Sequence, residues 1–284
     1  MLVAILLVLS SGLAHAVWNL FTKRSHNKQV FLWLIHITSA IMLLPLFLIE
    51  LTRASIPTEG WLFIGLSALF QIGYGLLLPQ TYRFGDMSQM YPIMRGTGAL
   101  FVPILSVWIY RESLSFAGWL GVCCIVAGLF AISGVTQRRN AANSDYRKLL
   151  LALAVGCCIT GYVMTDKMVL NWISPVSLIE LSNLAYVLAL LPAVLKSRGI
   201  RREWTANRST ILLGTIFSPG SYLLFLLAMT LAPLSHLAPI REIGTVFGTL
   251  FGIYWLKEKA GRSRILMSAV ITAGILVIGV WGGS

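Results

Sequence analysis

Residues 91–112 read YPIMRGTGALFVPILSVWIYRE, an apolar stretch with a single arginine, Arg95, near its start. The stretch returns 146 positions later as LAPIREIGTVFGTLFGIYWLKE, residues 237–258, where Arg241 stands in place of Arg95. Each copy is long enough to cross a bilayer, which takes about 20 apolar residues. An arginine at the bilayer centre costs about 2.5–3.5 kcal/mol on insertion scales. A duplicated span that carries this cost twice predicts that the arginines have a function.

The overall composition is that of a membrane protein. Of the 284 residues, 57% are hydrophobic and only 11% are charged, against about 25% charged residues in an average soluble domain. Apolar runs this long form helices rather than barrel strands. We count ten spans: 2–21, 30–51, 60–82, 87–110, 114–134, 147–170, 175–196, 209–231, 234–256 and 263–282. The sequence therefore predicts an all-α membrane protein with no room for a soluble catalytic domain.

The first two spans also recur, 144 positions later. Lys23 corresponds to Lys167 in this register, and His36 corresponds to Glu180. The chain thus divides into two five-helix repeats joined by a polar linker, a pattern to be sought before any other motif. The predicted boundaries are 1–135, 136–147 and 148–284. Because five is odd, the second repeat is inverted relative to the first, as in transporters that bind substrate near the midplane between such repeats.

Basic residues are concentrated in alternate loops. The formal net charge of +12 is spread over short loops between spans, so we expect no nucleic-acid partner. The positive-inside rule places the richer loops in the cytoplasm and therefore both termini outside the cell (inner) membrane. The poorer loops hold only Arg53, Arg111 and Lys167. The richer loops hold Lys23, Arg24, Lys28, Arg83, Arg138, Arg139, Arg147, Lys148, Lys196, Arg198, Arg201, Arg202, Arg208, Lys257, Lys259, Arg262 and Arg264.

Arg95 and Arg241 are the first candidate substrate-binding residues. Intramembrane arginines usually face the bundle interior or a water-filled cavity, although snorkelling toward an interface is the alternative for residues one to two turns into a helix. A guanidinium pairs with carboxylate or phosphate groups in bidentate fashion. We therefore predict that the two arginines bind an anionic group, with Tyr91, Tyr82 and Tyr186 as weaker candidates.

His36 and Glu180 form a second symmetric pair inside their spans. A histidine and a carboxylate can share or relay a proton, and such groups mark proton-coupled transporters. The pair is therefore a candidate for proton coupling or charge balance. The alternative, which we prefer, is that Glu180 is the counter-ion of an intramembrane arginine.

His15, Trp18 and Asn19 share one face of the first span, because they fall at spacings of three and four. Facing a cavity, this face could stack on and hydrogen-bond an organic solute. For Trp18 and Lys23 we favour an interfacial belt, where Trp and Lys are common. His15 and Asn19 lie deeper, so we predict that they bind substrate, with Trp18 as the third member of the face.

Two helix-weakening segments occupy matching depths in the two repeats. Gly73-Tyr74-Gly75 lies in the third span, and Pro219-Gly220-Ser221-Tyr222 begins 146 positions on, in the eighth. Interruptions at matched positions point to a binding site in transporters. The alternative is the ordinary tolerance of membrane helices for Gly and Pro.

Recognisable catalytic and nucleotide-binding motifs are missing from the sequence. There is no P-loop, HExxH or GxSxG, and the cysteines form two adjacent pairs, Cys123-Cys124 and Cys157-Cys158, without metal-ligand spacing. We therefore expect no enzyme activity, no cofactor and no metal. The expected partners are a small-molecule substrate and the lipid bilayer, with the protein a monomer or a homodimer.

The sequence also resembles a known family. HAVWNLFTK at 15–23, the segment 95–129 and its second-half echo are similar to EamA-type members of the drug/metabolite transporter superfamily. The resemblance covers essentially the whole chain and implies ten helices in two five-helix repeats. In that family a basic residue and a glutamate follow the fourth helix, as do Arg111-Glu112 and, in the second half, Lys257-Glu258. These motifs identify the family and not the substrate, because members export amino acids and other metabolites, and relatives carry sugar nucleotides or organic phosphates.

The chain departs from its relatives in ways that bear on function. The second copy has Tyr162 and Val163 in place of Trp18 and Asn19, so a site built on the first span is asymmetric. Small multidrug-resistance relatives use a glutamate in their first helix to export cationic drugs, whereas the first span here has no acidic residue. This argues against a cationic-drug exporter. Several family members are described with cytoplasmic termini, contrary to the loop charges here.

Together these features predict a secondary transporter for a small anionic or zwitterionic organic metabolite, such as an amino acid, an organic acid or a phosphonate- or phosphate-like compound. It would work by alternating access across the inner membrane, with a midplane site lined by spans one to four and six to nine. One alternative is a flippase of a lipid-linked substrate. A less favoured one is a non-transporting membrane sensor or enzyme subunit.

Overall fold

The computed structural model describes residues 1–84, 87–133, 144–257 and 262–282. Glu258 and most of the predicted linker lie outside these ranges. Residues 144–147, predicted as the end of the linker, already belong to a helix. The described helices are α1 (Leu2–Arg24), α2 (Lys28–Leu51), α3 (Thr58–Phe84), α4 (Met87–Ile109), α5 (Phe116–Ser133), α6 (Ser144–Val169), α7 (Pro175–Ser197), α8 (Ile200–Met229), α9 (Leu234–Ile240), α10 (Ile243–Tyr254) and α11 (Arg262–Trp281).

The helical architecture confirms the predicted all-α membrane fold. Among the described residues, seven helices are long and apolar enough to cross a membrane, namely α1 to α4 and α6 to α8. Shorter apolar segments lie in α5, over Phe116–Ala131, and in α11, over Leu266–Trp281. Ten membrane crossings remain a prediction.

The ninth predicted span, 234–256, is two helices and not one. α9 ends at Ile240 and α10 begins at Ile243. Between them the chain makes three-residue turns, since the N–H of Glu242 bonds to the carbonyl of Pro239 and that of Gly244 to the carbonyl of Arg241. Pro239 has no N–H to give to the helical ladder. The break places Arg241 and Glu242 in a tight turn inside the bundle.

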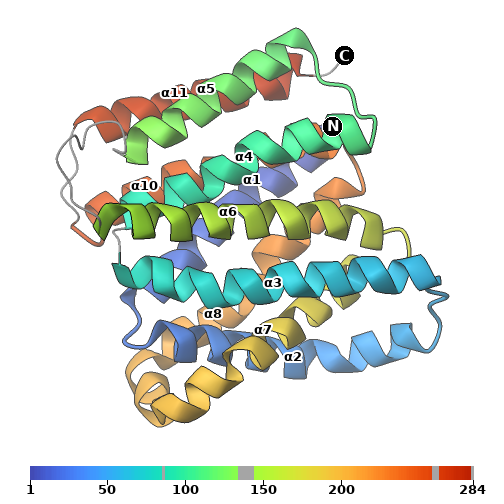
Figure 1. Cartoon of the computed structure of the whole chain (residues 1–284), viewed down its shortest axis with the longest axis vertical. Coiled ribbons are helices and arrows are strands. Elements are labelled where there is room, and N and C mark those ends of the chain that lie inside the picture. The colour runs from blue at the N-terminus through green and yellow to red at the C-terminus, as the bar shows by residue number, and fades with distance from the viewer. Residues whose placement is uncertain (85–86, 134–143, 258–261, 283–284) are drawn as a thin grey trace.

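Helix packing follows the sequence repeat (Figure 1). α3 packs on α6 in the way that its counterpart α8 packs on α1, and α4 packs on α6 in the way that α10 packs on α1. Two pairs of equivalent helices also pack on each other: α2 with α7 and α5 with α11. This is the pattern expected when two halves are related by a two-fold axis, and it puts α1 and α6 at the centre of the contacts.

Two equivalent glycines let the arginine segments approach the central helices closely. A Cβ added to Gly12 on α1 would lie 2.9 Å from the carbonyl oxygen of Arg241, and one on Gly156 of α6 would lie 2.7 Å from that of Met94. Both distances are too short for a side chain. The small residues therefore bring the backbone around each arginine against the first helix of the other repeat.

The ends of the bundle are tied in a symmetric way. Lys23 Nζ at the end of α1 donates to the carbonyl of Tyr82 at 3.0 Å, and Lys167 Nζ at the end of α6 donates to that of Met229 at 2.7 Å. The start of α1 and the end of α11 both lie toward the right in Figure 1. Which side of the membrane this is remains a prediction from the loop charges.

Candidate functional site

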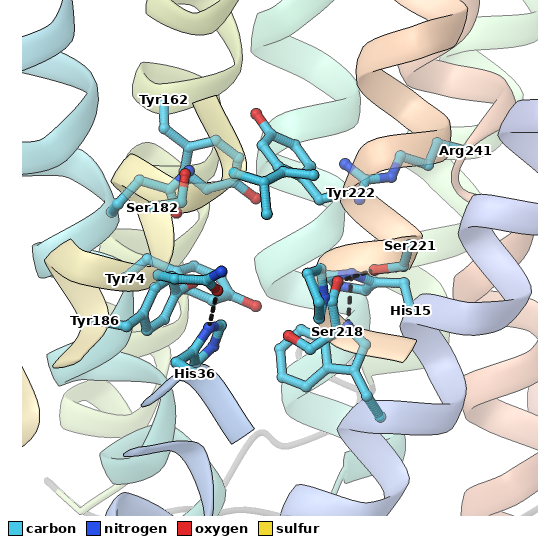
Figure 2. Close-up of a pocket in the computed structure, with 15 residues that line it drawn as sticks. His15, His36, Tyr74, Tyr162, Ser182, Tyr186, Ser218, Ser221, Tyr222 and Arg241 are labelled. Atoms are coloured by element: carbon cyan, nitrogen blue, oxygen red, sulfur yellow. Dashed lines mark hydrogen bonds between the residues drawn. The ribbon is translucent and has the colours of Figure 1, made fainter. Parts of the chain in front are cut away.

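A cavity with about 410 Å³ of empty space lies between the two repeats (Figure 2). Five aromatic rings, two histidines and one arginine are among its walls. The lining residues are His15 and Trp18 on α1, His36 on α2, Gln71 and Tyr74 on α3, Tyr162 on α6, Ile179, Ser182, Asn183 and Tyr186 on α7, Ser218, Pro219, Ser221 and Tyr222 on α8, and Arg241 after α9.

Most of the helices predicted to line a midplane site contribute to this cavity. The fourth span, by contrast, supplies none of its described lining residues. The two helix-weakening segments are both represented, by Tyr74 on α3 and by Pro219 and Ser221 on α8. Neither helix is interrupted there, since the non-helical residue of α8 is Asn207, well before the cavity.

Arg241 is held in place by its neighbours, and one of its nitrogens has no hydrogen-bond partner among the described residues. Its Nε donates to Ser11 Oγ at 3.1 Å, and that hydroxyl donates to the carbonyl of Ser221 at 2.6 Å. The guanidinium lies over the ring of Phe225, with Cζ 4.2 Å from the centroid. Its Nη2 has no hydrogen-bond partner among the described residues. Arg241 thus places a fixed positive charge among the residues that line the cavity, and one of its donor nitrogens is buried without a partner in the described part of the chain.

His15 supplies a second free donor on the same wall (Figure 2). Its Nδ1 accepts a hydrogen bond of 3.3 Å from Trp18 Nε1. A neutral histidine that accepts at Nδ1 carries its proton on Nε2. His15 Nε2 is buried without a partner in the described part of the chain. Trp18 is only 4% exposed, so the preferred interfacial-belt interpretation of this residue is wrong.

The opposite wall offers an acceptor. His36 stacks on Tyr186, with centroids 4.0 Å apart, and its Nδ1 lies 2.9 Å from Asn183 Oδ1. An amide oxygen only accepts, so this nitrogen is the donor and His36 Nε2 keeps a lone pair. Nε2 has no partner among the described residues. Figure 2 shows His36, Tyr186 and Tyr74 across the cavity from Arg241 and His15.

Arg95 does not share the cavity with Arg241. Its Nη2 lies 2.7 Å from Glu242 Oε1, and its Nε donates to Glu242 Oε2 at 3.1 Å. Both side chains are buried. They line a separate space of about 250 Å³, which the side chain of Arg241 also reaches. The two arginines predicted to act together are therefore in different settings, one neutralised and one facing the larger cavity.

Glu180 is not the counter-ion of an arginine, contrary to our preferred interpretation. The carboxylate that pairs with Arg95 is Glu242. Glu180 instead accepts a 3.5 Å hydrogen bond from Asn183 Nδ2, and its Oε1 is buried without a partner among the described residues. Asn183 therefore joins Glu180 to His36, the residue that the sequence repeat pairs with it.

Two predicted substrate-binding residues lie behind the walls and do not line the cavity. Asn19 donates to the carbonyl of His15 at 2.8 Å and accepts from the hydroxyl of Tyr82 at 2.7 Å, so it supports α1. The ring of Tyr91 lies 6.2 Å from that of His15, and its hydroxyl has no partner in the described residues. Both belong to the shell around His15.

Sequence reasoning missed several residues in and around the cavity. Tyr162 occupies the position equivalent to Trp18, and this register could have identified it. Asn183 and Ser11 are uncharged and carry no sequence signal, although they orient His36 and Arg241. Asp166 was overlooked because it lies near the end of its span, where a charge is ordinarily interfacial.

Comparison with known proteins agrees with this architecture. Each half of the chain matches the model of the EamA-like transporter family, over residues 2–134 and 147–280. A solved crystal structure superposes with a TM-score of 0.70 over 98% of this chain and 98% of its own, at 16% sequence identity. At that identity the likeness shows the fold alone. A search of curated protein sequences gives no match.

The membrane-length helices and the two matching halves define a multi-pass membrane protein built from an internal repeat. The chain belongs to the EamA-like transporter family, which confirms the resemblance found in its sequence.

Proposed function

We propose that this protein is a secondary transporter for a small organic metabolite that carries an anionic group, working by alternating access across the inner membrane. Ten membrane crossings in two inverted repeats would provide the scaffold. The observation that carries the proposal is Arg241, a buried guanidinium with an unpartnered Nη2 on a cavity between the repeats.

The donors on one wall favour an anion. Arg241 Nη2 and His15 Nε2 are both without partners among the described residues, and a carboxylate or phosphonate has several lone pairs to offer them. Leaving buried donors unsatisfied costs about 1–3 kcal/mol for each group. An anion that fills both recovers this energy, and its charge also compensates that of Arg241.

The acceptor on the other wall favours a substrate with a second, hydrogen-donating group. His36 lines the cavity on the side opposite Arg241, and its Nε2 has no partner among the described residues. An ammonium or hydroxyl of the substrate can donate to it. Between the walls, the rings of Trp18, Tyr74 and Tyr162 surround the organic body. A zwitterion such as an amino acid uses both walls, whereas a simple organic acid uses one.

Two further pairs of polar residues near the cavity receive roles in this proposal. Arg95 and Glu242 come from different repeats and neutralise each other, so we assign them to holding the repeats together. His36 and Glu180, joined through Asn183, are assigned to adjusting charge on the wall opposite Arg241.

Thermal stabilisation of the detergent-purified protein tests the proposal. The panel contains 3-phenylpropionate, phenylalanine, phenylphosphonate and, as a cation of similar size, phenethylamine. A ligand of the folded state raises the unfolding temperature in a concentration-dependent manner. We expect the anions and the zwitterion to stabilise the wild type.

Arg241→Ala is the decisive variant for this experiment. A hydrogen bond to a charged group contributes about 1.5–3 kcal/mol, so anion affinity should fall by about 10- to 100-fold. Stabilisation by phenethylamine alone, or unchanged anion binding in Arg241→Ala, would contradict the proposal. Glu59→Gln, an exposed substitution at the start of α3, is the control.

A further inference from the structure

A carboxylate that has no role in the proposed anion site lies beside the cavity. Asp166 on α6 is completely buried. Its two oxygens accept hydrogen bonds from the hydroxyls of Ser67 on α3 and Tyr222 on α8, and the side chain of Gln71 also hydrogen-bonds to it. No salt bridge joins Asp166 to a basic residue within the described part of the chain. Its charge is therefore supported by neutral donors alone.

Tyr222 connects Asp166 to the cation of the cavity. Its hydroxyl donates to Asp166, and its ring centroid lies 5.4 Å from Cζ of Arg241. Figure 2 shows the ring of Tyr222 at the cavity next to the guanidinium. One tyrosine side chain therefore separates the carboxylate from the charge that would bind an anion.

The titratable groups that interact with Asp166 are mostly tyrosines. The neighbouring helix α3 presents Ser67 and Gln71, which do not titrate in this range. Glu112 accepts from the backbone N–H groups of Leu234 and Ser235. The tyrosines are Tyr110 after α4, Tyr162 on α6, Tyr186 on α7 and Tyr222 on α8. Lys167, the residue after Asp166, donates to the carbonyl of Met229. The other titratable or charged groups that interact with Arg241 include His15 on α1, Arg95 on α4 and Glu242.

We propose that Asp166 is a proton-binding site linked to Arg241, and that one proton enters the protein with each substrate anion. This inference rests on the proposed function and adds the coupling ion to it. A monovalent anion and a proton that move together carry no net charge, so the coupled step is electroneutral.

The linkage follows from competition for Tyr222 and Arg241. In the empty cavity the ionised carboxylate of Asp166 accepts from the Tyr222 hydroxyl and offsets the charge of Arg241 across the ring. An entering anion places a second negative charge on the same guanidinium. A proton from water then binds Asp166, the Tyr222 hydroxyl is released, and this hydroxyl becomes available to donate to the anion.

The sign of the pH dependence follows from reciprocity. If the anion makes proton binding tighter, the proton makes anion binding tighter by the same factor. Anion affinity therefore rises as pH falls, by at most about tenfold per pH unit when one proton is taken up. Loss of the proton on the more alkaline side of the membrane favours release of the anion there.

Calorimetric titration of the full-length protein with 3-phenylpropionate tests the inference. The carboxylate of this probe stays ionised between about pH 6 and about pH 8, so its own titration does not interfere. Dissociation constants are measured at both pH values, and repeating the titration in buffers of different ionisation enthalpy counts the protons taken up. The wild type should bind more tightly at the lower pH and take up protons on binding.

Three variants locate the effect. Asp166→Asn imitates the protonated acid, so it should bind the probe with similar affinity at both pH values and without proton uptake. Tyr222→Phe keeps the acid but removes the hydroxyl, so both the pH dependence and the affinity at about pH 6 should fall. Glu59→Gln, on the surface of the same bundle, should behave as the wild type.

The outcomes separate this inference from the proposed function. Binding by the wild type without pH dependence, or pH-dependent binding retained in Asp166→Asn, overturns the inference and leaves the anion site intact. If Glu180→Gln alone removes the pH dependence, the coupling site is on α7 and the inference is wrong. If neither the probe nor the other anions bind the wild type, both proposals are wrong. Should Asp166→Asn fail to purify, the Tyr222→Phe titration decides.

Discussion

The two repeats contain equivalent arginines, Arg95 within α4 and Arg241 in the turn between α9 and α10, and use them differently. Arg95 is closed off by Glu242, with 2.7 Å between Nη2 and Oε1. Arg241 faces the cavity and keeps Nη2 without a partner among the described residues. The difference arises at one pair of equivalent positions, because Glu242 stands where the first repeat has Gly96. One acidic residue thus neutralises the arginine of the other repeat and leaves its neighbour available.

The first helices of the repeats show the opposite relation. Trp18 on α1 and Tyr162 on α6 are equivalent in sequence, and both line the cavity from opposite repeats. The duplicated aromatic positions build symmetric walls, whereas the duplicated arginines supply one binding charge and one structural pair. Two free guanidiniums in an empty cavity would repel each other, and the pairing of Arg95 with Glu242 removes this repulsion.

Removal of Arg95 is expected to have the largest effect on the stability of the protein. In Arg95→Ala the carboxylate of Glu242 is left buried without its partner, which costs about 3–5 kcal/mol. We expect a large fall in the unfolding temperature of the purified protein. The double variant Arg95→Met/Glu242→Met replaces the pair by apolar side chains and should recover most of the loss. A double variant as unstable as the single one would show that the pair is not the cause.

The glycine contacts can be tested in both repeats. Gly12→Ala and Gly156→Ala each insert a Cβ within 3 Å of a backbone oxygen of the arginine segment. Overpacking of this kind costs about 1–3 kcal/mol, so both variants should unfold at lower temperature. Gly65→Ala, where an added Cβ meets no atom within 4 Å, is the matched control. Equal behaviour of all three variants would contradict the close approach.

The smallest expected effect is on ligand affinity, and it distinguishes the roles of the two cavity walls. Asn183→Ala removes the partner of His36 Nδ1 and so loosens the acceptor that faces the substrate. Because a neutral hydrogen bond contributes about 0.5–1.5 kcal/mol, affinity for phenylalanine should fall by up to about tenfold. Affinity for 3-phenylpropionate, which lacks the amino group, should change little. Equal losses for both ligands would argue against a separate acceptor wall.

Much of the fold could be predicted from the sequence because bilayer crossing imposes long apolar runs, and these correspond closely to α1 through α7. The eighth span was predicted to begin at residue 209, but α8 begins at Ile200 and has a non-helical residue at Asn207. The two-fold relation could also be predicted, because equivalent residues recur at a spacing of 144 for Lys23 and Lys167 and of 146 for Arg95 and Arg241. The break within the ninth span was not predicted. A single proline in an apolar run does not tell whether a helix bends or stops.

The site was less predictable because it depends on which buried groups meet. Glu180 was expected to be the counter-ion of an intramembrane arginine, whereas the packing of α4 against the α9–α10 turn brings Glu242 to Arg95. Asp166 lies within a turn of its helix end, so hydropathy gives it no weight. Its importance comes from Tyr222 on another helix, which no local pattern reveals.

Transport into proteoliposomes is the most direct test of the central claim, that Arg241 and not Arg95 binds the anion. Counterflow of labelled phenylalanine or 3-phenylpropionate is compared for the wild type, Arg241→Ala and Arg95→Met/Glu242→Met, at equal amounts of folded protein. We expect loss of counterflow in Arg241→Ala and its retention in the double variant. Counterflow retained without Arg241 and lost without Arg95 and Glu242 would contradict this claim.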